Sequence, residues 1–388
     1  MHPPADFEPR SEAPLIKARS LVFVRHRRRD LDEALRFYTD FGLELAEQSN
    51  PEAEPPGSMT WGRTERALYL RAAGGGPICV IIESGAHDEL AGFAVEAESE
   101  IALHRLAAEV GAAVEARGEP GGGLVVRLRD PAELDVEVVY GVAAAPVREP
   151  SPPVPVNTFD HPARINAPRP AVLGPAWVRR LGHVVLGRQE FARNTRWYMK
   201  TLGVIASDVE VLPELGEPIV AFLRFDRGDM PSDHHSIVVA AAPEDGYIHA
   251  AFESTDVDAL GAGAEWLQHR GWVKSWGIGR HVLGSQLFCY HIDPHGFEVE
   301  HYVDGDMFDA SHPTGYHEAG LPGLYLWGPV LPPHFVDTSM TLRRLGRVIR
   351  GLRTRDEFTL KRLLATKRLY SRPPRPWAAK RFVRPKAR

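Results

Sequence analysis

The stretch GRHVLGSQLFCYHIDPHGFEVE, residues 279–300, carries the strongest signal for fold and chemistry in this chain. Two apolar runs flank Asp293-Pro294-His295-Gly296, a composition that favours a tight turn joining two strands. Tyr290 and Glu300 fall on these two runs, and His281 precedes the tyrosine by nine residues. Imidazole, phenol and carboxylate groups brought together in this way can hold a metal ion and move protons.

Size and composition are those of a globular protein with several domains. The chain has 388 residues, of which 44% are hydrophobic and 25% charged, and only two cysteines, Cys79 and Cys289. Two thiols are too few for a disulfide scaffold or a thiolate metal cage. The first fifteen residues lack the pattern of a signal peptide, and no apolar run reaches membrane-spanning length. We therefore expect a cytoplasmic enzyme without a membrane partner.

The C-terminal tail differs in charge from the rest of the chain. From Arg343 onward, 17 Lys and Arg residues stand against Asp356 and Glu357, whereas the whole chain has a net charge of −5. Apolar residues recur at helical spacing through 340–370, with arginines between them. Nucleic-acid or membrane binding is one interpretation. We favour a solvated helix that docks on the acidic body of the protein or on a neighbouring subunit.

A proline-rich stretch at 143–176 is read as a linker, because it cannot sustain a helix or an inner strand. It separates two similar halves, residues 18–142 and 177–305, which leaves 306–388 as a C-terminal extension. Each half opens with an apolar strand and a capped helix, predicted at 30–41 and from Phe191 to near Gly203. Several short β-rich runs follow each helix.

The spacing of matched residues supports a duplication. Loop insertions shift the offset between equivalent positions by only a few residues over a long span. The matched pairs are Phe23 with His183 and Tyr38 with Tyr198 at an offset of 160, Gly92 with His249 at 157, and Glu137 with Glu300 at 163. The first half thus lacks two of the three candidate ligands, and we expect it to be a structural copy of an active second half.

Strand alternation selects His183, His249 and Glu300 as candidate metal ligands. Each lies on a predicted strand, and strands of one curved sheet can direct the three side chains to a common point. Two imidazoles and one carboxylate leave open positions on the metal, as in non-haem Fe(II) oxygenases. Each histidine alone would more often be a buried structural residue, and their joint occurrence at matched places favours a site. The other histidines nearby, His234, His291, His295 and His301, are expected in loops or on the surface.

The second half resembles the extradiol ring-cleavage dioxygenases of the vicinal oxygen chelate superfamily. The resemblance rests on the segments 180–186 and 248–252, on His281 and Tyr290, and on the closing run 293–300. It implies an α+β fold of tandem paired βαβββ modules, with the metal site in the cavity of the C-terminal module. It covers roughly residues 18–305 and leaves the extension outside.

The resemblance also implies roles and partners. Fe(II), with Mn(II) as an alternative, would be held by the three ligands and would bind a catechol and O₂ for ring cleavage beside the diol. His235 would act as acid and base, while Tyr290 and His281 would donate hydrogen bonds. We expect a homo-oligomer and no nucleic-acid partner.

Two departures bear on the substrate and the class of protein. Ile248 precedes His249 where many members have a second histidine, and 282–285 replaces a more polar run.

A metal isomerase of the glyoxalase kind would draw ligands from both modules. The presence of Phe23 and Gly92 in the first module argues against that class. A non-catalytic binding protein would need no ligand set and should purify without metal. Trp272, Trp276 and Phe288 are candidates for the lining of an aromatic pocket, although core packing is the commoner role for such residues. The segment 320–333 is a candidate for closing over the cavity, with a surface loop as the alternative.

Overall fold

The hairpin expected from residues 279–300 is present. Strands β16 (Leu287–Ile292) and β17 (Glu298–Val303) run antiparallel, and Tyr290 lies opposite Glu300. In the turn between them, the backbone N–H of Asp293 donates to the carbonyl of Phe297 at 2.8 Å. This computed structural model describes residues 3–4, 7–46, 62–147, 155–169, 174–336 and 342–370.

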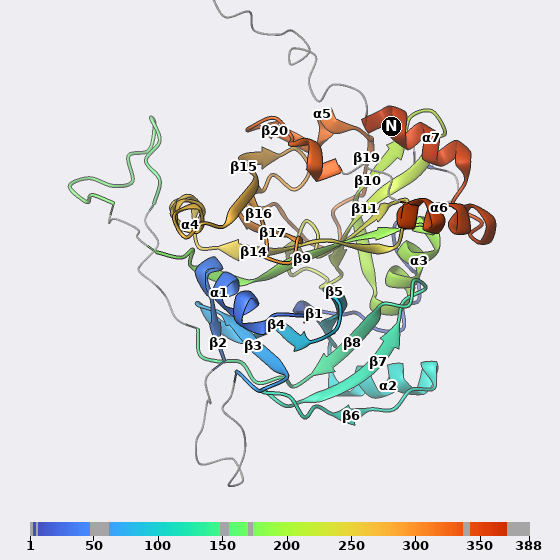
Figure 1. Cartoon of the computed structure of the whole chain (residues 1–388), viewed down its shortest axis with the longest axis horizontal. Helices are drawn as coiled ribbons and strands as arrows, with labels where there is room; N and C mark the ends of the chain where they lie inside the picture. Colours follow the sequence, from blue (N-terminus) through green and yellow to red (C-terminus); the bar gives the residue numbers. More distant parts are fainter. Residues whose placement is uncertain are drawn as a thin grey trace, which may run out of the picture.

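Each half of the chain forms two βαβββ units that share one mixed sheet (Figure 1), which confirms the expected tandem α+β architecture. The first half contains β1 (Leu21–Arg28), α1 (Leu31–Phe41), β2 (Leu43–Leu45), β3 (Ala67–Ala72), β4 (Gly75–Ser84), β5 (Glu89–Glu96), α2 (Glu100–Val110), β6 (Glu115–Ala116), β7 (Leu124–Arg129) and β8 (Asp135–Tyr140). The second half contains β9 (Val178–Arg188), α3 (Phe191–Leu202), β10 (Val204–Leu212), β11 (Glu217–Phe225), β12 (Ser232–Asp233), β13 (Ile237–Ala241), β14 (Gly246–Ser254), α4 (Val257–His269) and β15 (Val273–His281), followed by β16 and β17.

The two units of each half meet at the centre of their sheet. The strand orders are β2-β3-β4-β1-β5-β8-β7-β6 in the first module and β19-β10-β11-β13-β9-β14-β17-β16-β15-β20 in the second. The central pairs β1–β5 and β9–β14 are antiparallel, and each of their strands has a parallel partner on its other side. The two sheets therefore repeat one topology.

The capped helices form as their sequences predict. Asp30 accepts a hydrogen bond from the backbone of Glu33, and α1 ends at Gly42. Gly42 has a φ of 109°, and a β-carbon there would lie 2.1 Å from the carbonyl oxygen of Ala176. Only glycine meets both demands. In the second half, α3 ends before Gly203 in the same left-handed conformation.

The first helix of each module, α1 or α3, contacts the sheet of the other module. Phe41 of α1 contacts Phe252 of β14, with ring centroids 5.4 Å apart, and stacks on His301 of β17 at 3.6 Å. Tyr198 of α3 lies 6.1 Å from Phe93 of β5. Buried residues of both modules thus form one continuous core, which fixes the two sheets relative to each other.

The C-terminal extension completes the second sheet. It contains β18 (Met307–Phe308), β19 (Gly315–Glu318), α5 (Leu321–Leu324), β20 (Tyr325–Trp327), a 3₁₀ turn (Pro333–Val336), α6 (Leu342–Thr354) and α7 (Leu360–Tyr370). Strand β19 pairs in parallel with β10, and β20 pairs with β15, so the extension supplies both edge strands. The expected single helix over 340–370 is two helices, with residues 340–341 outside the described part.

Helices α6 and α7 and the turn that joins them carry basic side chains that meet acidic groups of the second module. Arg347 pairs with Glu244 at 2.5 Å, Arg355 with Glu190 at 2.5 Å, and Arg368 with Glu214 at 2.7 Å. These contacts agree with docking on the acidic body of the chain. No helix in the described part of the chain combines the length and apolar character that a membrane crossing requires.

The domain boundaries expected at 18–142, 143–176, 177–305 and 306–388 stay predictions. Strand β8 ends at Tyr140 and β9 begins at Val178. Residues 155–169 between them form neither helix nor strand, while 148–154 and 170–173 lie outside the described residues. The tail beyond Tyr370 also lies outside them.

Candidate metal centre

Three neighbouring strands position the predicted ligands. His183 on β9 lies opposite Ala251 on β14, and Ala251 lies opposite Glu300 on β17, so these three residues form one row across the sheet. His249 stands two residues before Ala251 on the central strand and therefore points to the same face. Ala251, fully buried and small, leaves space between the flanking side chains.

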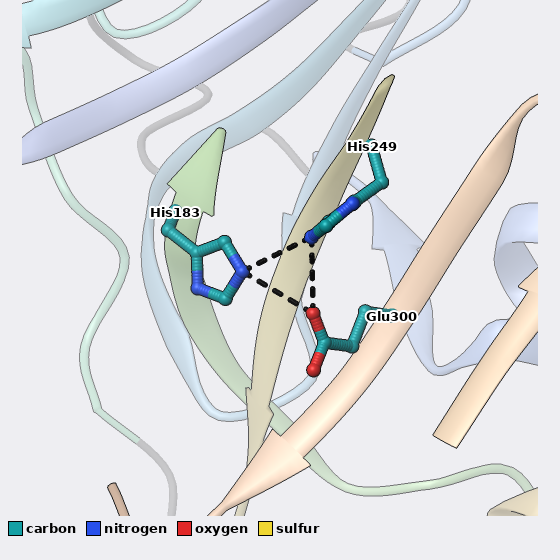
Figure 2. A group of neighbouring side chains, drawn as sticks. All are labelled: His183, His249 and Glu300. Atoms are coloured by element: carbon teal, nitrogen blue, oxygen red, sulfur yellow. Dashed lines mark hydrogen bonds and ion pairs between the residues drawn. The ribbon is translucent and has the colours of Figure 1, made fainter. Parts of the chain in front are cut away.

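The ligand atoms converge on one point (Figure 2). The Nε2 atoms of His183 and His249 are 3.3 Å apart, and each lies 3.2 Å from Oε2 of Glu300. Ligands bound to one ion at about 2.1 Å and at right angles are separated by about 3 Å. The triangle therefore matches three adjacent positions on a single divalent metal, and in the described residues it is the cluster with metal-ligand geometry.

The electrostatics of the cluster call for a cation. Burial alone would raise the pKa of Glu300, but the contacts with His183 and His249 outweigh it and hold that pKa well below its usual range. Burial lowers the pKa of His249 despite the nearby carboxylate. Neither carboxylate oxygen of Glu300 has a hydrogen-bond partner of acceptable geometry within the described residues. A buried carboxylate beside a neutral imidazole is the donor set that a divalent metal stabilises.

His235 lies beside the predicted ligands, as the sequence suggests. Its ring centroid is 4.3 Å from that of His183, and its side chain is buried. Burial first, and then the neighbouring imidazoles of His183 and His234, lower its pKa well below the usual value. His235 is therefore neutral and able to accept a proton.

Tyr290 and His281 form a hydrogen-bonded pair at the same site. Nδ1 of His281 lies 2.8 Å from the carbonyl oxygen of Leu324, so this nitrogen carries a proton. In the tautomer with its proton on Nδ1, Nε2 of His281 accepts from the hydroxyl of Tyr290 at 3.0 Å. Burial and the charge of Glu300 raise the pKa of Tyr290 well above its usual value, which keeps the phenol protonated.

The C-terminal extension packs behind these two residues. Phe335 contacts the rings of both Trp276 and Tyr290, with centroids 5.0 Å apart in each case. The indole N–H of Trp276 donates to the carbonyl of Pro329 at 3.0 Å. Trp276 is only 2% exposed, so it packs in the core rather than lining an open pocket. The segment 320–333 thus supports the site wall from outside.

The first module has the same row of strand positions without the ligands. Phe23 lies opposite Ala94, Ala94 opposite Glu137, and Arg25 opposite Gly92. Arg25 donates to Oε1 of Glu137 from Nε at 2.9 Å and from Nη2 at 2.7 Å. A guanidinium therefore neutralises the carboxylate that corresponds to Glu300.

Two further features close the first-module position to a metal. Burial alone would lower the pKa of Arg25, but the carboxylates of Glu119 and Glu137 raise it, so the guanidinium stays charged. At Gly92, a β-carbon would lie 2.5 Å from the carbonyl oxygen of Asp135. No imidazole can be placed there without a shift of the backbone.

Of the remaining histidines, His234 and His295 lie in loops as expected, whereas His291 and His301 lie on β16 and β17, and none of the four side chains is at the surface. His234, His291 and His301 are each at most 1% exposed, and the side chain of His295 is 5% exposed. Nε2 of His301 donates to the carbonyl of Phe41 on α1 at 2.7 Å. His291 and His301 were expected at the surface because the sequence does not show that α4 and α1 cover their face of the sheet.

Comparisons with known proteins agree with this geometry. Residues 180–301 match the family model of the Glyoxalase/Bleomycin resistance protein/Dioxygenase superfamily, a range that contains all three predicted ligands. The second module is similar to the proteins of this superfamily. The fold expected from the resemblance to vicinal oxygen chelate proteins is thereby confirmed.

Individual relatives within the superfamily are also similar to the chain. Metapyrocatechase 2 from Cupriavidus necator is 36% identical over 160 residues, which are 41% of this chain and 47% of that protein. The chain thus spans about half the length of this curated relative.

Two solved structures of superfamily proteins share the fold over most of their length. The Mn(II)-bound glyoxalase from Novosphingobium aromaticivorans has a TM-score of 0.66 at 21% identity and covers 84% of this chain and 96% of its own. Homoprotocatechuate 2,3-dioxygenase from Arthrobacter globiformis has a TM-score of 0.65 at 19% identity, with 87% and 97% covered. At these identities the likeness concerns the fold.

Proposed function

We propose that this chain is a metal-dependent extradiol dioxygenase that cleaves the ring of a catechol with O₂. The observation that carries the proposal is the buried triangle of His183, His249 and Glu300, with 3.2–3.3 Å between its ligand atoms. Similarity to a metapyrocatechase over 160 residues supports the same reaction class.

The ligand set suits Fe(II) and also Mn(II). The bound ion would supply adjacent open positions for a diol and for dioxygen, and a path for charge between them. We propose Fe(II) as the resident metal, with Mn(II) as the alternative. Cytoplasmic location and a homo-oligomeric state stay predictions from the sequence.

The side chains around the triangle can serve this reaction. His235, neutral and next to His183, would take a proton from the catechol at Nε2 and return it later in the cycle. The hydroxyl of Tyr290 would turn from His281 to donate to a substrate oxygen. Nδ1 of His281 donates to the carbonyl of Leu324, which orients the ring so that Nε2 holds the hydroxyl of Tyr290 in place.

Anaerobic reconstitution with Fe(II), followed by oxygen and a panel of monocyclic and bicyclic catechols, tests the proposal. We expect one iron per chain and coloured ring-cleavage products. Iron binding without any ring cleavage across the panel would favour the alternative, a metal isomerase of the same fold. Purification and reconstitution without bound metal would favour a small-molecule-binding protein.

The variant His235→Phe separates metal binding from turnover. It should bind iron as the wild type does and lose most turnover, because the base is gone while the three ligands remain. Unchanged turnover would refute the role of His235 and would leave the assignment of the three metal ligands unaffected.

A further inference from the structure

A chain of hydrogen bonds leads from His235 away from the metal centre. Nδ1 of His235 lies 2.9 Å from Nδ1 of His234, and Nε2 of His234 lies 2.7 Å from Oδ2 of Asp208 on β10. The other carboxylate oxygen, Oδ1, lies 2.7 Å from Nε2 of His317 on β19. The chain ends at this histidine, whose side chain is 43% exposed.

The carboxylate fixes where the protons of this chain sit. Burial would raise the pKa of Asp208, but the hydrogen bonds with His234 and His317 outweigh it, so the pKa is lowered and the group is ionised. An ionised carboxylate only accepts, so Nε2 of His234 must carry a proton. In a neutral His234, Nδ1 is then an acceptor, and Nδ1 of His235 must donate to it. The remaining nitrogen of His235, Nε2, is left with a lone pair.

His234 is held so that it cannot leave this arrangement. It is 1% exposed, and its backbone N–H donates to the carbonyl of Asp306 at 2.8 Å. The rings of Phe222 and Phe308 pack on it at 5.6 and 5.4 Å. Gly284, with a φ of 78°, approaches so closely that a β-carbon there would lie 3.0 Å from Nδ1 of His234.

We propose that His234 and Asp208 are positioning residues that hold His235 in the tautomer with its proton on Nδ1 and a free lone pair on Nε2. The tautomer itself does not depend on the proposed function, and only its consequence rests on that function. With a lone pair on Nε2, His235 can act as a base that takes a proton from a catechol. The same hydrogen bonds also stabilise His235 after it has taken up the proton. A cationic His235 still donates through Nδ1 to His234, and the charge is stabilised by the carboxylate of Asp208.

The tautomer can be measured without substrate or turnover. Imidazole ¹⁵N shifts distinguish a protonated from an unprotonated nitrogen, and the full-length protein loaded with diamagnetic Zn(II) is suited to this measurement. His235 signals are assigned by their loss in His235→Phe. We expect the proton on Nδ1. A proton on Nε2 in the wild type would overturn the proposal whether or not the protein cleaves catechols.

Two variants test the cause of the tautomer. His234→Phe keeps a ring of similar size but removes the acceptor that faces Nδ1 of His235, so the proton should redistribute toward Nε2. His317→Ala is the matched control, because it removes the exposed partner of Asp208 and leaves the Asp208–His234 bond. An unchanged tautomer in His234→Phe would overturn the proposal.

Steady-state kinetics distinguish a positioning role of His234 from a purely structural one. His234→Phe should lower kcat by about 10- to 100-fold, with KM and bound metal as in the wild type. His317→Ala should keep the wild-type kcat. Wild-type kcat in His234→Phe, or a loss of activity that follows a loss of bound metal, would overturn the proposal.

Discussion

Arg28 of the first module donates from Nη2 to Oδ2 of Asp293 of the second at 3.1 Å, and neither side chain is exposed to solvent. Asp293 also shapes the turn between β16 and β17, because its Oδ1 accepts from the backbone N–H groups of His295 and Phe297. One carboxylate therefore closes the hairpin that carries Tyr290 and Glu300 and joins it to the other module.

An equivalent ion pair joins the modules in the other direction, with the arginine from the second module and the aspartate from the first. Arg188 of the second module donates to Asp130 of the first at 2.7 Å, and Tyr198 donates to the same oxygen at 2.6 Å. Arg188 is 2% exposed and Asp130 is in the turn that corresponds to Asp293. Each module thus provides the partner for a buried charge in the other.

Breaking one of these pairs should destabilise the protein strongly. Arg28→Met leaves the carboxylate of Asp293 buried without its cation, which costs about 3–5 kcal/mol. The matched control is Arg129→Met, since Arg129 pairs with Glu133 at 3.5 Å on the surface, with both side chains largely exposed. That change should cost less than about 1 kcal/mol. Urea unfolding of both variants measures the difference, and equal losses would contradict the buried pair as a stabilising contact.

Equivalent glutamates in the two modules should respond differently to the same change. Glu300→Gln should abolish stoichiometric metal binding and turnover, because it removes the anionic ligand. Glu137→Gln should keep the bound metal but lower the free energy of unfolding by about 1–3 kcal/mol, since Arg25 loses one of the three carboxylates that lie 2.7 Å from it.

Metal analysis and urea unfolding of the two variants provide the test. Loss of metal in Glu137→Gln would mean that the first module also holds an ion, contrary to the exchange of its ligands for Phe23 and Gly92.

Acid should destabilise the protein through buried neutral histidines. Burial, followed by the neighbouring His301, lowers the pKa of His291 to about 3, whereas an unfolded histidine has a pKa of about 6.5. Below about pH 6.5 the unfolded chain binds a proton that folded His291 does not, so stability falls as the pH falls. For His291 the loss between pH 7 and pH 5 is about 2 kcal/mol.

The variant His291→Phe should lack this part of the pH dependence. Both ring nitrogens of His291 are without a hydrogen-bond partner within the described residues, so the phenyl ring should also raise stability at pH 7 by about 1 kcal/mol. Urea unfolding in the presence of EDTA, at pH 7 and pH 5, gives both quantities without a contribution from metal release. Parallel pH profiles for the two proteins would refute the assignment.

Removal of the Tyr290 hydroxyl should affect turnover and leave the metal. Tyr290→Phe takes away the donor opposite Glu300, and kcat should fall by about 100-fold with one metal per chain retained. Tyr247→Phe is the control, because Tyr247 lies on β14 two residues from His249 and its hydroxyl has no hydrogen-bond partner in the described structure. Equal activity of the two variants would argue against a role for Tyr290.

The ligand triangle was predictable because its signal is local. Alternation along a strand decides the face of each of His183, His249 and Glu300, and the first-half residues at equivalent spacings identify which copy carries the candidate ligands. The strand register agrees with those spacings, since Phe23 and His183 each lie opposite an alanine that in turn lies opposite a glutamate.

The contacts around the triangle could not be predicted, because their partners are remote in sequence. Asp293 reads as a turn residue, yet one of its oxygens bonds Arg28, which is 265 residues away. Asp208 and His317 are 109 residues apart, and nothing in either segment indicates the other. His281 gains its fixed tautomer from a backbone carbonyl of the extension, a group that every residue carries.

Gly92 makes a metal site in the first module difficult to build. With the carbonyl of Asp135 only 2.5 Å from where a β-carbon would stand, replacement of Gly92 by histidine would require β5 and β8 to separate locally. Such a site would also have to displace the guanidinium of Arg25 from Glu137. Engineering a second metal centre in this protein therefore needs a redesigned backbone and not only a new side chain.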